Sequence, residues 1–367
     1  MRFLHTADWQ IGMKAAGLGP CAALVRAERL AGAQRVMLIA AQEQAEFIVL
    51  AGDTFEDNAV RRQLVRDVIG ILAKAPCPVY ILPGNHDPLC AGSVWDMAEW
   101  RSTPVIHLLD EEKPVPVFPG VTLYPCPIRE RFGVDDPTAW ISPDGDGIRI
   151  GVAHGSVEGL QMDDPQFPIP RDAPARRGLD YVALGHWHSF GEIADANGSR
   201  MAYSGTHEPT AFGERDSGNA VLVEIGKRGD APVLRKIRSA GLQWRLLDEY
   251  VSRPGDLAAL LEMVGKIPDP ASALVRLKVR GVFTLDEIGM LETLRAMHER
   301  GRFFYFDLIE EALAPAPSGN DWLDAIPDPV VREAAYLIAG ELGDSVGAAV
   351  RRQALLELYS IVRETAG

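Results

Sequence analysis

The chain has 367 residues, of which 47% are hydrophobic and 24% charged, values that exclude a fibrous or largely disordered protein. Its 51 acidic residues outnumber 37 basic ones; the formal net charge of −14 excludes binding to nucleic acid by bulk positive charge. The four cysteines show no CxxC spacing, and no apolar run reaches the roughly 18 residues of a membrane span. The first residues lack the pattern of a signal peptide, so we expect a cytoplasmic protein without membrane contact.

Short apolar runs alternate with helical patterns near the start of the chain. The apolar runs predict strands at 2–7, 47–51 and 79–82, and the helical spacing predicts helices at 22–45 and 59–73. This β-α-β-α-β order is typical of an α/β core.

After residue 104 the pattern becomes rich in strands. The polar, proline-rich segment 157–178 predicts a surface loop. The predicted strands are 105–109, 115–118, 121–124, 148–153 and 181–184, followed by hairpins at 191–203 and 219–238.

A change of pattern near residue 240 predicts a domain boundary. The expected parts are a domain at 1–240, a small α/β domain at 241–313, a linker at 314–329 and helices at 330–367. Within the small domain, the predicted elements are a strand or connector at 242–251, helices at 255–265 and 285–299, and strands at 273–280 and 303–309.

Polar residues follow the predicted strands at their carboxyl ends. The carboxyl ends of strands in an α/β sheet border one crevice, so these side chains are expected to converge. Carboxylate, imidazole and amide oxygen suit Mn, Fe or Zn better than Ca or Mg, and one carboxylate can bridge two ions. The pattern therefore predicts a pair of divalent metals acting on a phosphoryl group. The residues are Asp8, Gln10, Asp53, Asn85, His86, Asp87, His154, His186 and His188.

The motifs differ in specificity. A single Asp after a strand is as often a helix cap or turn residue as a ligand. The Gly-Asn-His-Asp motif at 84–87 and the Gly-His-Trp-His motif at 185–188 are more specific, because such polar groupings have no evident use in a core.

The series Asp-x-Gln, Gly-Asp, Gly-Asn-His-Asp, His and Gly-His-x-His resembles the signature of the calcineurin-like metallophosphoesterases. Within them, LHTADWQIG, LAGDTFED, LPGNHD, VAHG, YVALGHWH and YSGTHEPTAFGE are most similar to SbcD-type DNA repair exonucleases, the nuclease subunits of SbcC–SbcD complexes. The motifs extend from residue 1 to about 240. The resemblance implies a sandwich of two mixed sheets flanked by helices, a smaller α/β capping domain and a C-terminal helical segment.

The resemblance also implies a role for each residue. The first metal would be surrounded by Asp8, Gln10, Asp53 and His188. The second metal would be surrounded by Asp53, Asn85, His154 and His186, with Asp53 as the bridge. His86 would face the scissile phosphate and stabilise the transition state or protonate the leaving oxygen, and Asp87 would orient His86 or cap the turn.

Two residues depart from the family pattern. Gln10 stands where the family usually has His, and Glu56 stands where it often has His. A carboxamide oxygen is a weaker ligand for a transition metal than an imidazole, and a carboxylate puts negative charge near a phosphate. We therefore expect a weakened first metal site.

The resemblance implies a metal-dependent DNA exonuclease or endonuclease in DNA repair. Its expected cofactors are two divalent ions, Mn first and Fe or Zn as alternatives. Its expected partners are DNA, an SbcC-like SMC-type ATPase that docks on the C-terminal helices, and a second copy in a homodimer. Two alternatives stay open: a small-molecule phosphodiesterase or phosphatase using the same site, and a structural subunit of an ATPase complex with a weakened site.

Overall fold

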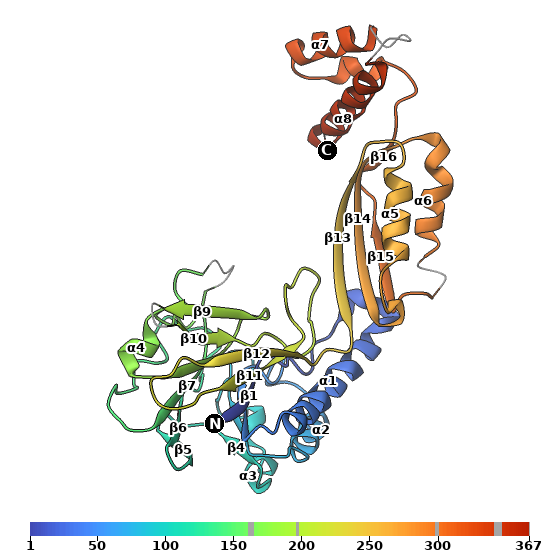
Figure 1. Cartoon of the computed structure of the whole chain (residues 1–367). Coiled ribbons are helices and arrows are strands. Elements are labelled where there is room, and N and C mark those ends of the chain that lie inside the picture. Colours follow the sequence, from blue (N-terminus) through green and yellow to red (C-terminus); the bar gives the residue numbers. More distant parts are fainter. Residues whose placement is uncertain (161–164, 196–197, 298–300, 341–346, 367) are drawn as a thin grey trace. The chain divides into compact units, whose positions relative to one another are not determined.

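The computed structural model describes residues 1–160, 165–195, 198–297, 301–340 and 347–366. The chain divides into two compact units, Met1–Leu242 and Gln243–Gly367 (Figure 1). The division lies close to the change of sequence pattern near residue 240.

The first unit contains a six-stranded sheet in the order β12-β11-β1-β2-β3-β4. The four strands from β1 to β4 run parallel, and β11 pairs antiparallel with β1 and with β12. The strands are β1 (Arg2–Thr6), β2 (Phe47–Ala51), β3 (Val79–Leu82), β4 (Ile106–Leu108), β11 (Asn219–Glu224) and β12 (Val233–Arg238).

A second six-stranded sheet of the same unit has the order β5-β6-β7-β8-β10-β9. It mixes a parallel centre from β6 to β10 with antiparallel edges. The strands are β5 (Val115–Phe118), β6 (Val121–Pro125), β7 (Ile148–His154), β8 (Tyr181–Gly185), β9 (Gly191–Asp195) and β10 (Gly198–Tyr203).

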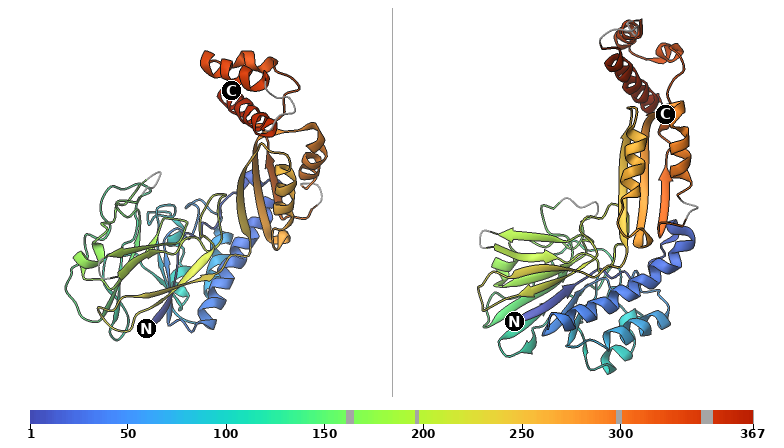
Figure 2. Two further views of the ribbon diagram at one scale, coloured as in Figure 1. Left: turned by 45° about the horizontal axis from the view of Figure 1, so that its top comes forward. Right: turned by 45° about the vertical axis from the view of Figure 1, so that its right-hand side comes forward.

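The two sheets face each other across an apolar layer (Figure 2). The alternation of β2 explains this arrangement: Phe47 and Val49 point into the layer between the sheets, whereas Ile48 and Leu50 point toward the helices. Because β2 is buried on both faces, all five of its residues are apolar. The structure therefore confirms the predicted two-sheet sandwich.

Helices cover the outer face of the first sheet. Helix α1 (Ala22–Gln42) and helix α2 (Arg62–Leu72) bury their apolar residues against this sheet. The short helix α3 (Glu99–Ser102) buries Trp100 in the same cluster. Both long helices are predicted by the sequence.

The segment 157–178 differs from the surface loop that the sequence predicts. Within its described part, Ile169 and Ala173 are buried, and helix α4 (Ala173–Arg177) follows. The reason is an isolated β-bridge between Val157 and Ile169, which draws this segment into the apolar cluster on the outer face of the second sheet.

The second unit contains a parallel sheet in which β14 is central, with helices α5 and α6 on one face (Figures 1 and 2). This confirms the predicted small α/β arrangement. Its elements are β13 (Gln243–Val251), α5 (Asp256–Gly265), β14 (Ala273–Phe283), α6 (Ile288–Arg295), β15 (Tyr305–Ile309) and β16 (Leu313–Pro315).

The segment 314–329, expected to be a linker, contains regular structure. Its first residues belong to β16, and a 3-10 helix spans Asp321–Ala325. Leu323 and Ile326 are buried together with Ala335 and Leu355, because the C-terminal helices need an apolar partner. The segment therefore forms part of the C-terminal helical cluster.

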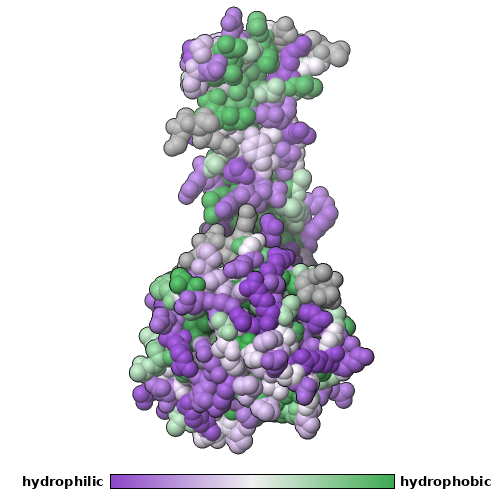
Figure 3. Space-filling model, turned by 90° about the vertical axis from the view of Figure 1, so that its left-hand side faces the viewer, coloured by the Kyte–Doolittle hydropathy of each residue, from purple (hydrophilic) through white to green (hydrophobic). Residues whose placement is uncertain are grey.

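Two helices end the chain, α7 (Pro329–Gly340) and α8 (Ala348–Ala366), as predicted. Hydrophobic atoms gather over this part of the surface (Figure 3). The exposed large hydrophobic residues of the two helices are Val330, Val331, Tyr336, Leu337, Val350 and Ile361. None of the helices in the described ranges has the length and apolar character needed to cross a membrane.

Candidate metal centre

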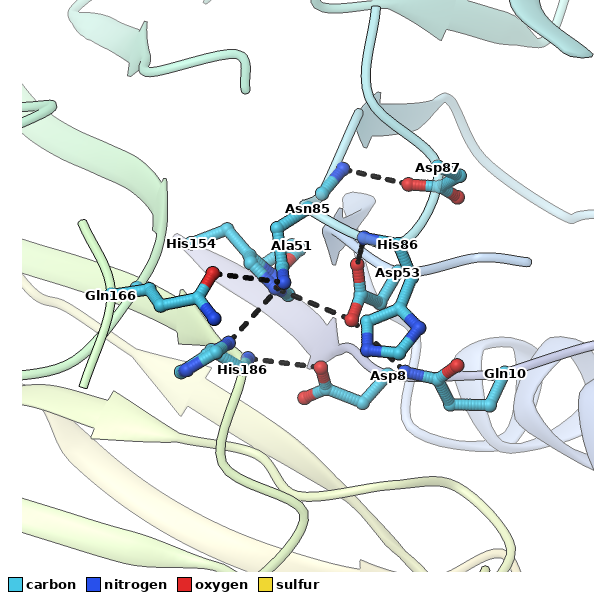
Figure 4. A network of polar contacts seen from close by, with 12 residues as sticks. Asp8, Gln10, Ala51, Asp53, Asn85, His86, Asp87, His154, Gln166 and His186 are labelled. Carbon is cyan, nitrogen blue, oxygen red and sulfur yellow. Dashed lines mark hydrogen bonds and ion pairs between the residues drawn. The ribbon is translucent and has the colours of Figure 1, made fainter. Parts of the chain in front are cut away.

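The polar residues that follow the strands converge where the carboxyl ends of the two sheets meet (Figure 4). Contacts between the sheets hold them together. The His186 backbone N–H donates to Asp8 Oδ1 at 2.9 Å, and His154 Nδ1 donates to the Ala51 carbonyl at 2.9 Å. The convergence of polar residues predicted from the strand order is therefore present.

The backbone turns sharply at these positions. Asp8, Gln10, Asp53 and His186 all have positive φ, at 52°, 45°, 53° and 106°. Non-glycine residues adopt this region at a cost, and such positions cluster at functional sites. The turns direct the polar side chains toward one another, while Trp9, between Asp8 and Gln10, is fully buried in the core.

Two glycines leave room for the site residues. A Cβ at Gly52, whose φ is 93°, would lie 2.1 Å from His154 Nδ1. A Cβ at Gly84 would lie 2.2 Å from Asp53 Oδ1. Both positions therefore need glycine because the side chains of His154 and Asp53 occupy the space.

One group of donor atoms surrounds Asn85. Its Oδ1 lies 2.9 Å from His154 Nε2 and 3.3 Å from His186 Nδ1. His154 Nε2 also lies 3.4 Å from Asp53 Oδ2. His154 Nδ1 donates its proton to the Ala51 carbonyl, so in the neutral ring Nε2 carries a lone pair that faces the oxygens of Asn85 and Asp53. A proton or a cation between these atoms would remove the repulsion between their lone pairs.

A second group of donor atoms contains two oxygens without a hydrogen-bond partner in the structure. These are Asp8 Oδ2 and Gln10 Oε1, both buried. Buried carboxylate and amide oxygens are normally satisfied, so each of these two oxygens is available to a cation. Asp8, Asp53 and His154 also offer ligand atoms within 4.8 Å of one another. These residues fit a metal centre.

Gln10 is oriented differently from what the sequence predicts. Its Nε2, rather than its oxygen, faces the Asp53 carboxylate and donates to Asp53 Oδ2 at 2.9 Å. The amide therefore occupies a lone pair of Asp53 that a metal would use.

His188 follows His186 on the same loop, but its Nδ1 lies 3.0 Å from Glu214 Oε1 and 3.0 Å from Thr210 Oγ1. Burial opposes charging of His188, but the hydrogen bond to Glu214 and the charge of Asp8 raise its pKa. Sequence reasoning missed Glu214 and Thr210, because their distance along the chain from His188 carries no signal of contact.

His86 lies beside Asp53, and its backbone N–H donates to Asp53 Oδ1 at 2.9 Å. Its Nδ1 lies 3.0 Å from the Glu56 carbonyl, so Nδ1 carries the proton and Nε2 is the nitrogen available to a substrate. This contact uses the backbone of Glu56 and not its carboxylate.

Asp87 has a structural role. Its two carboxylate oxygens accept the backbone N–H groups of Gly84 at 2.7 Å and Phe55 at 2.9 Å. It therefore ties the loop after β3 to the loop after β2, which holds His86 and Asp53 in place.

Burial and mutual charge set the protonation of the site. Burial raises the pKa of Asp8 to about 6, whereas the neighbouring His154 cation outweighs burial at Asp53 and holds its pKa well below the usual range. Burial opposes charging of His154, but the Asp53 carboxylate raises its pKa to about 9. Burial lowers the pKa of His186 to about 4. In the metal-free site, His154 is therefore protonated, and its Nε2 proton lies between Asn85 Oδ1 and Asp53 Oδ2.

Other polar residues support the fold. His5 Nδ1 lies 3.1 Å from the Tyr181 hydroxyl and its Nε2 3.1 Å from the Leu184 carbonyl, so both nitrogens are used between the sheets. The buried Arg29 donates to the Trp9 and Glu208 carbonyls and braces the loop that carries Asp8 and Gln10. Sequence reasoning also missed Arg29, because a charged residue within a helix pattern predicts an exposed face.

The comparisons with known proteins agree with this geometry. A family model described as Calcineurin-like phosphoesterase matches residues 1–190. The chain is 25% identical to the uncharacterized metallophosphoesterase YhaO of Bacillus subtilis (strain 168), over 72% of this chain and 66% of that protein. It is 24% identical to the D subunit of the nuclease SbcCD of the same organism, over 65% and 69% of the two chains.

Further relatives are more distant. The D subunit of the nuclease SbcCD of Staphylococcus epidermidis is 24% identical over 58% of this chain and 63% of that protein. The chain thus spans about two thirds of the length of these curated relatives. Among solved structures, TT1561 of Thermus thermophilus has a TM-score of 0.43 at 13% identity, covering 65% of this chain and 99% of that one. A dimetal phosphatase from Danio rerio has a TM-score of 0.39 at 12% identity, covering 64% and 98%.

The family model matches more than half of the chain and includes the loops that carry Asp8, Asp53, Asn85, His154, His186 and His188. The buried acidic, amide and imidazole groups at the meeting point of the two sheets supply the donor set that its chemistry requires. The chain therefore belongs to the calcineurin-like phosphoesterase family and is a metal-dependent phosphoester hydrolase.

Proposed function

We propose that this protein is a cytoplasmic, metal-dependent DNA nuclease that works with an SbcC-like ATPase. The observation that carries the proposal is the arrangement around Asp53, whose oxygens meet His154, Gln10 and the backbone of His86 in one buried cluster. The similarity to two proteins named as D subunits of the nuclease SbcCD supports DNA as the substrate.

Each half of the cluster would hold one divalent ion. Asp8, Gln10, Asp53 and His188 would hold the first. Asp53, Asn85, His154 and His186 would hold the second, so that Asp53 serves both. Bound metal ions polarise the phosphoryl oxygens and lower the pKa of bound water. Imidazole and carboxylate donors together favour Mn, with Fe or Zn as alternatives.

His86 would act on the substrate itself. The Glu56 carbonyl fixes Nδ1–H, and the loop held by Asp87 fixes the position of the ring. Its Nε2 would face the scissile phosphate, where a positioned imidazole can stabilise developing charge or protonate the leaving oxygen.

Hydrolysis of single-stranded DNA, measured beside hydrolysis of a cyclic nucleotide, tests this proposal. We expect Mn-dependent DNA cleavage that a chelator abolishes and that Asp53→Ala removes, because one carboxylate would serve both ions. Asp146→Ala, a change at an exposed aspartate, is the matched control and should keep full activity. Preference for the cyclic nucleotide would favour the small-molecule phosphodiesterase, and full DNA cleavage by Asp53→Ala would contradict the two-metal site.

The C-terminal helices are the proposed docking site of the ATPase. Val330, Leu337 and Val350 are 77%, 67% and 73% exposed, a degree unusual for large apolar side chains on neighbouring helices. The hydrophobic surface in Figure 3 lies over these helices. A homodimer stays a prediction.

Co-purification with the SbcC-like ATPase tests the docking site. Leu337→Glu combined with Val350→Glu should weaken complex formation and leave DNA cleavage by the isolated chain unchanged, since both side chains are exposed. Leu285→Glu changes another leucine that is 70% exposed and lies outside α7 and α8, so it should leave the complex intact. If the wild type, the double variant and Leu285→Glu all form the complex equally well, this surface is not the docking site.

A further inference from the structure

The ring of His188 is hydrogen-bonded to an acidic residue, Glu214. Its Nδ1 lies 3.0 Å from Glu214 Oε1. An ionised carboxylate only accepts hydrogen bonds, so Nδ1 of His188 must be the donor. The neutral ring then carries its lone pair on Nε2, the nitrogen that coordinates a metal in this tautomer.

Glu214 is itself fixed in place. Thr210 donates its hydroxyl to Glu214 Oε1 and its backbone N–H to Glu214 Oε2, the latter at 3.0 Å. The Glu214 side chain is only 11% exposed. Three donors therefore converge on one largely buried carboxylate, and the ring of His188 is held by a rigid partner.

The two halves of the metal centre differ in what supports their histidines. His154 donates to a neutral backbone carbonyl, that of Ala51. His188 donates to a carboxylate, which makes the imidazole a stronger electron donor. His188 belongs to the half that carries Gln10, where a neutral amide replaces an imidazole.

We propose that Glu214 is a positioning residue for metal binding, which fixes the tautomer and ring orientation of His188 and raises its donor strength. Thr210 supports it. This carboxylate would offset the weak donor Gln10 and keep the first metal half-site functional. The inference rests on the proposed function only in assigning His188 to that half-site.

Calorimetry with Mn²⁺ on the full chain tests the proposal. Glu214→Ala should weaken one of the two binding events about 10–100-fold and leave the other within about twofold of the wild type. Glu214→Gln, which keeps an acceptor oxygen but loses the charge, should fall between these values. Glu192→Gln, a change at an exposed glutamate of the same unit, should bind as the wild type.

Nitrogen-15 NMR of the metal-free protein gives a readout independent of metal and of cleavage. At a pH high enough for the ring to be neutral, the wild type should show His188 protonated at Nδ1 alone, Glu214→Gln should keep this tautomer, and Glu214→Ala should show a mixture. The proposal is overturned if Glu214→Ala keeps the tautomer and binds both ions as the wild type, or if it weakens both ions equally. A chain whose Mn²⁺ binding depends on Glu214 but that cleaves no DNA would refute the nuclease function and leave this inference standing.

Discussion

Replacing Gln10 by His should tighten the weaker metal site. In the structure Gln10 Nε2 donates to Asp53 Oδ2 at 2.9 Å, and its Oε1 has no partner. To place its oxygen on an ion that Asp53 also holds, the amide must rotate and give up this bond. A hydrogen bond to a charged group contributes about 1.5–3 kcal/mol. The first ion should therefore bind roughly 10–150-fold more weakly than it would beside an imidazole, because each 1.4 kcal/mol is about tenfold.

Titration calorimetry with Mn²⁺ measures this directly. The wild type should show one tight and one weak binding event, and Gln10→His should move the weak event toward the tight one. DNA cleavage by Gln10→His should rise at low Mn²⁺ and change little at saturation, since occupancy is the only quantity that changes. Two equally tight events in the wild type, or no change in Gln10→His, would refute the reasoning.

Two further predictions concern histidines with different roles. His86→Ala should bind two Mn²⁺ ions with wild-type affinity and lose at least about a hundredfold in cleavage rate, because it removes the imidazole but keeps the backbone N–H that donates to Asp53; loss of an ion in calorimetry would instead make His86 a ligand. Burial lowers the pKa of His5 from 6.5 to about 3, so the folded state resists protonation that the unfolded state accepts below pH 6.5. This stabilisation is complete above pH 6.5 and is lost by about 1.4 kcal/mol per pH unit as the pH falls toward 3. The free energy of unfolding in urea should therefore fall less between pH 7 and pH 4.5 for His5→Gln than for the wild type, by up to about 2.7 kcal/mol. Equal pH dependence of the two proteins would contradict the lowered pKa of His5.

The strands and most of the site could be predicted because their signals are local. The run Phe47–Ala51 is apolar throughout, which indicates a strand covered on both faces, and Gly52 and Asp53 mark its end. Since the strand ends of an α/β sheet share one edge, their polar residues could be grouped before their positions were known. The burial of Asp8, Asp53 and His154 in one cluster agrees with that expectation.

The remaining features depend on contacts between distant segments, which local patterns do not contain. The side chain of Glu214 reaches His188 because the loop after β10 returns to the site, and no spacing rule anticipates this. The bridge of Ile169 to Val157 draws in a segment whose composition is that of a surface loop. Whether Gln10 presents its nitrogen or its oxygen depends on Asp53, so the residue type alone could not predict the orientation of the amide.

The loops that form the site are destabilised by buried charge and by backbone strain, and contacts with the surrounding fold hold them in place. Asp8, Asp53 and Asp87 are buried within one group of loops, and their burial disfavours negative charge. Four site residues with positive φ add strain of about 1–3 kcal/mol each, a large share of the roughly 5–15 kcal/mol by which proteins are stable. The hydrogen bond from Arg29 to the Trp9 carbonyl and the two hydrogen bonds that Asp87 accepts from the backbone hold these loops in this conformation. A divalent cation placed among the carboxylates would compensate this concentration of charge, so the features that destabilise the empty site are the ones that prepare it to bind metal.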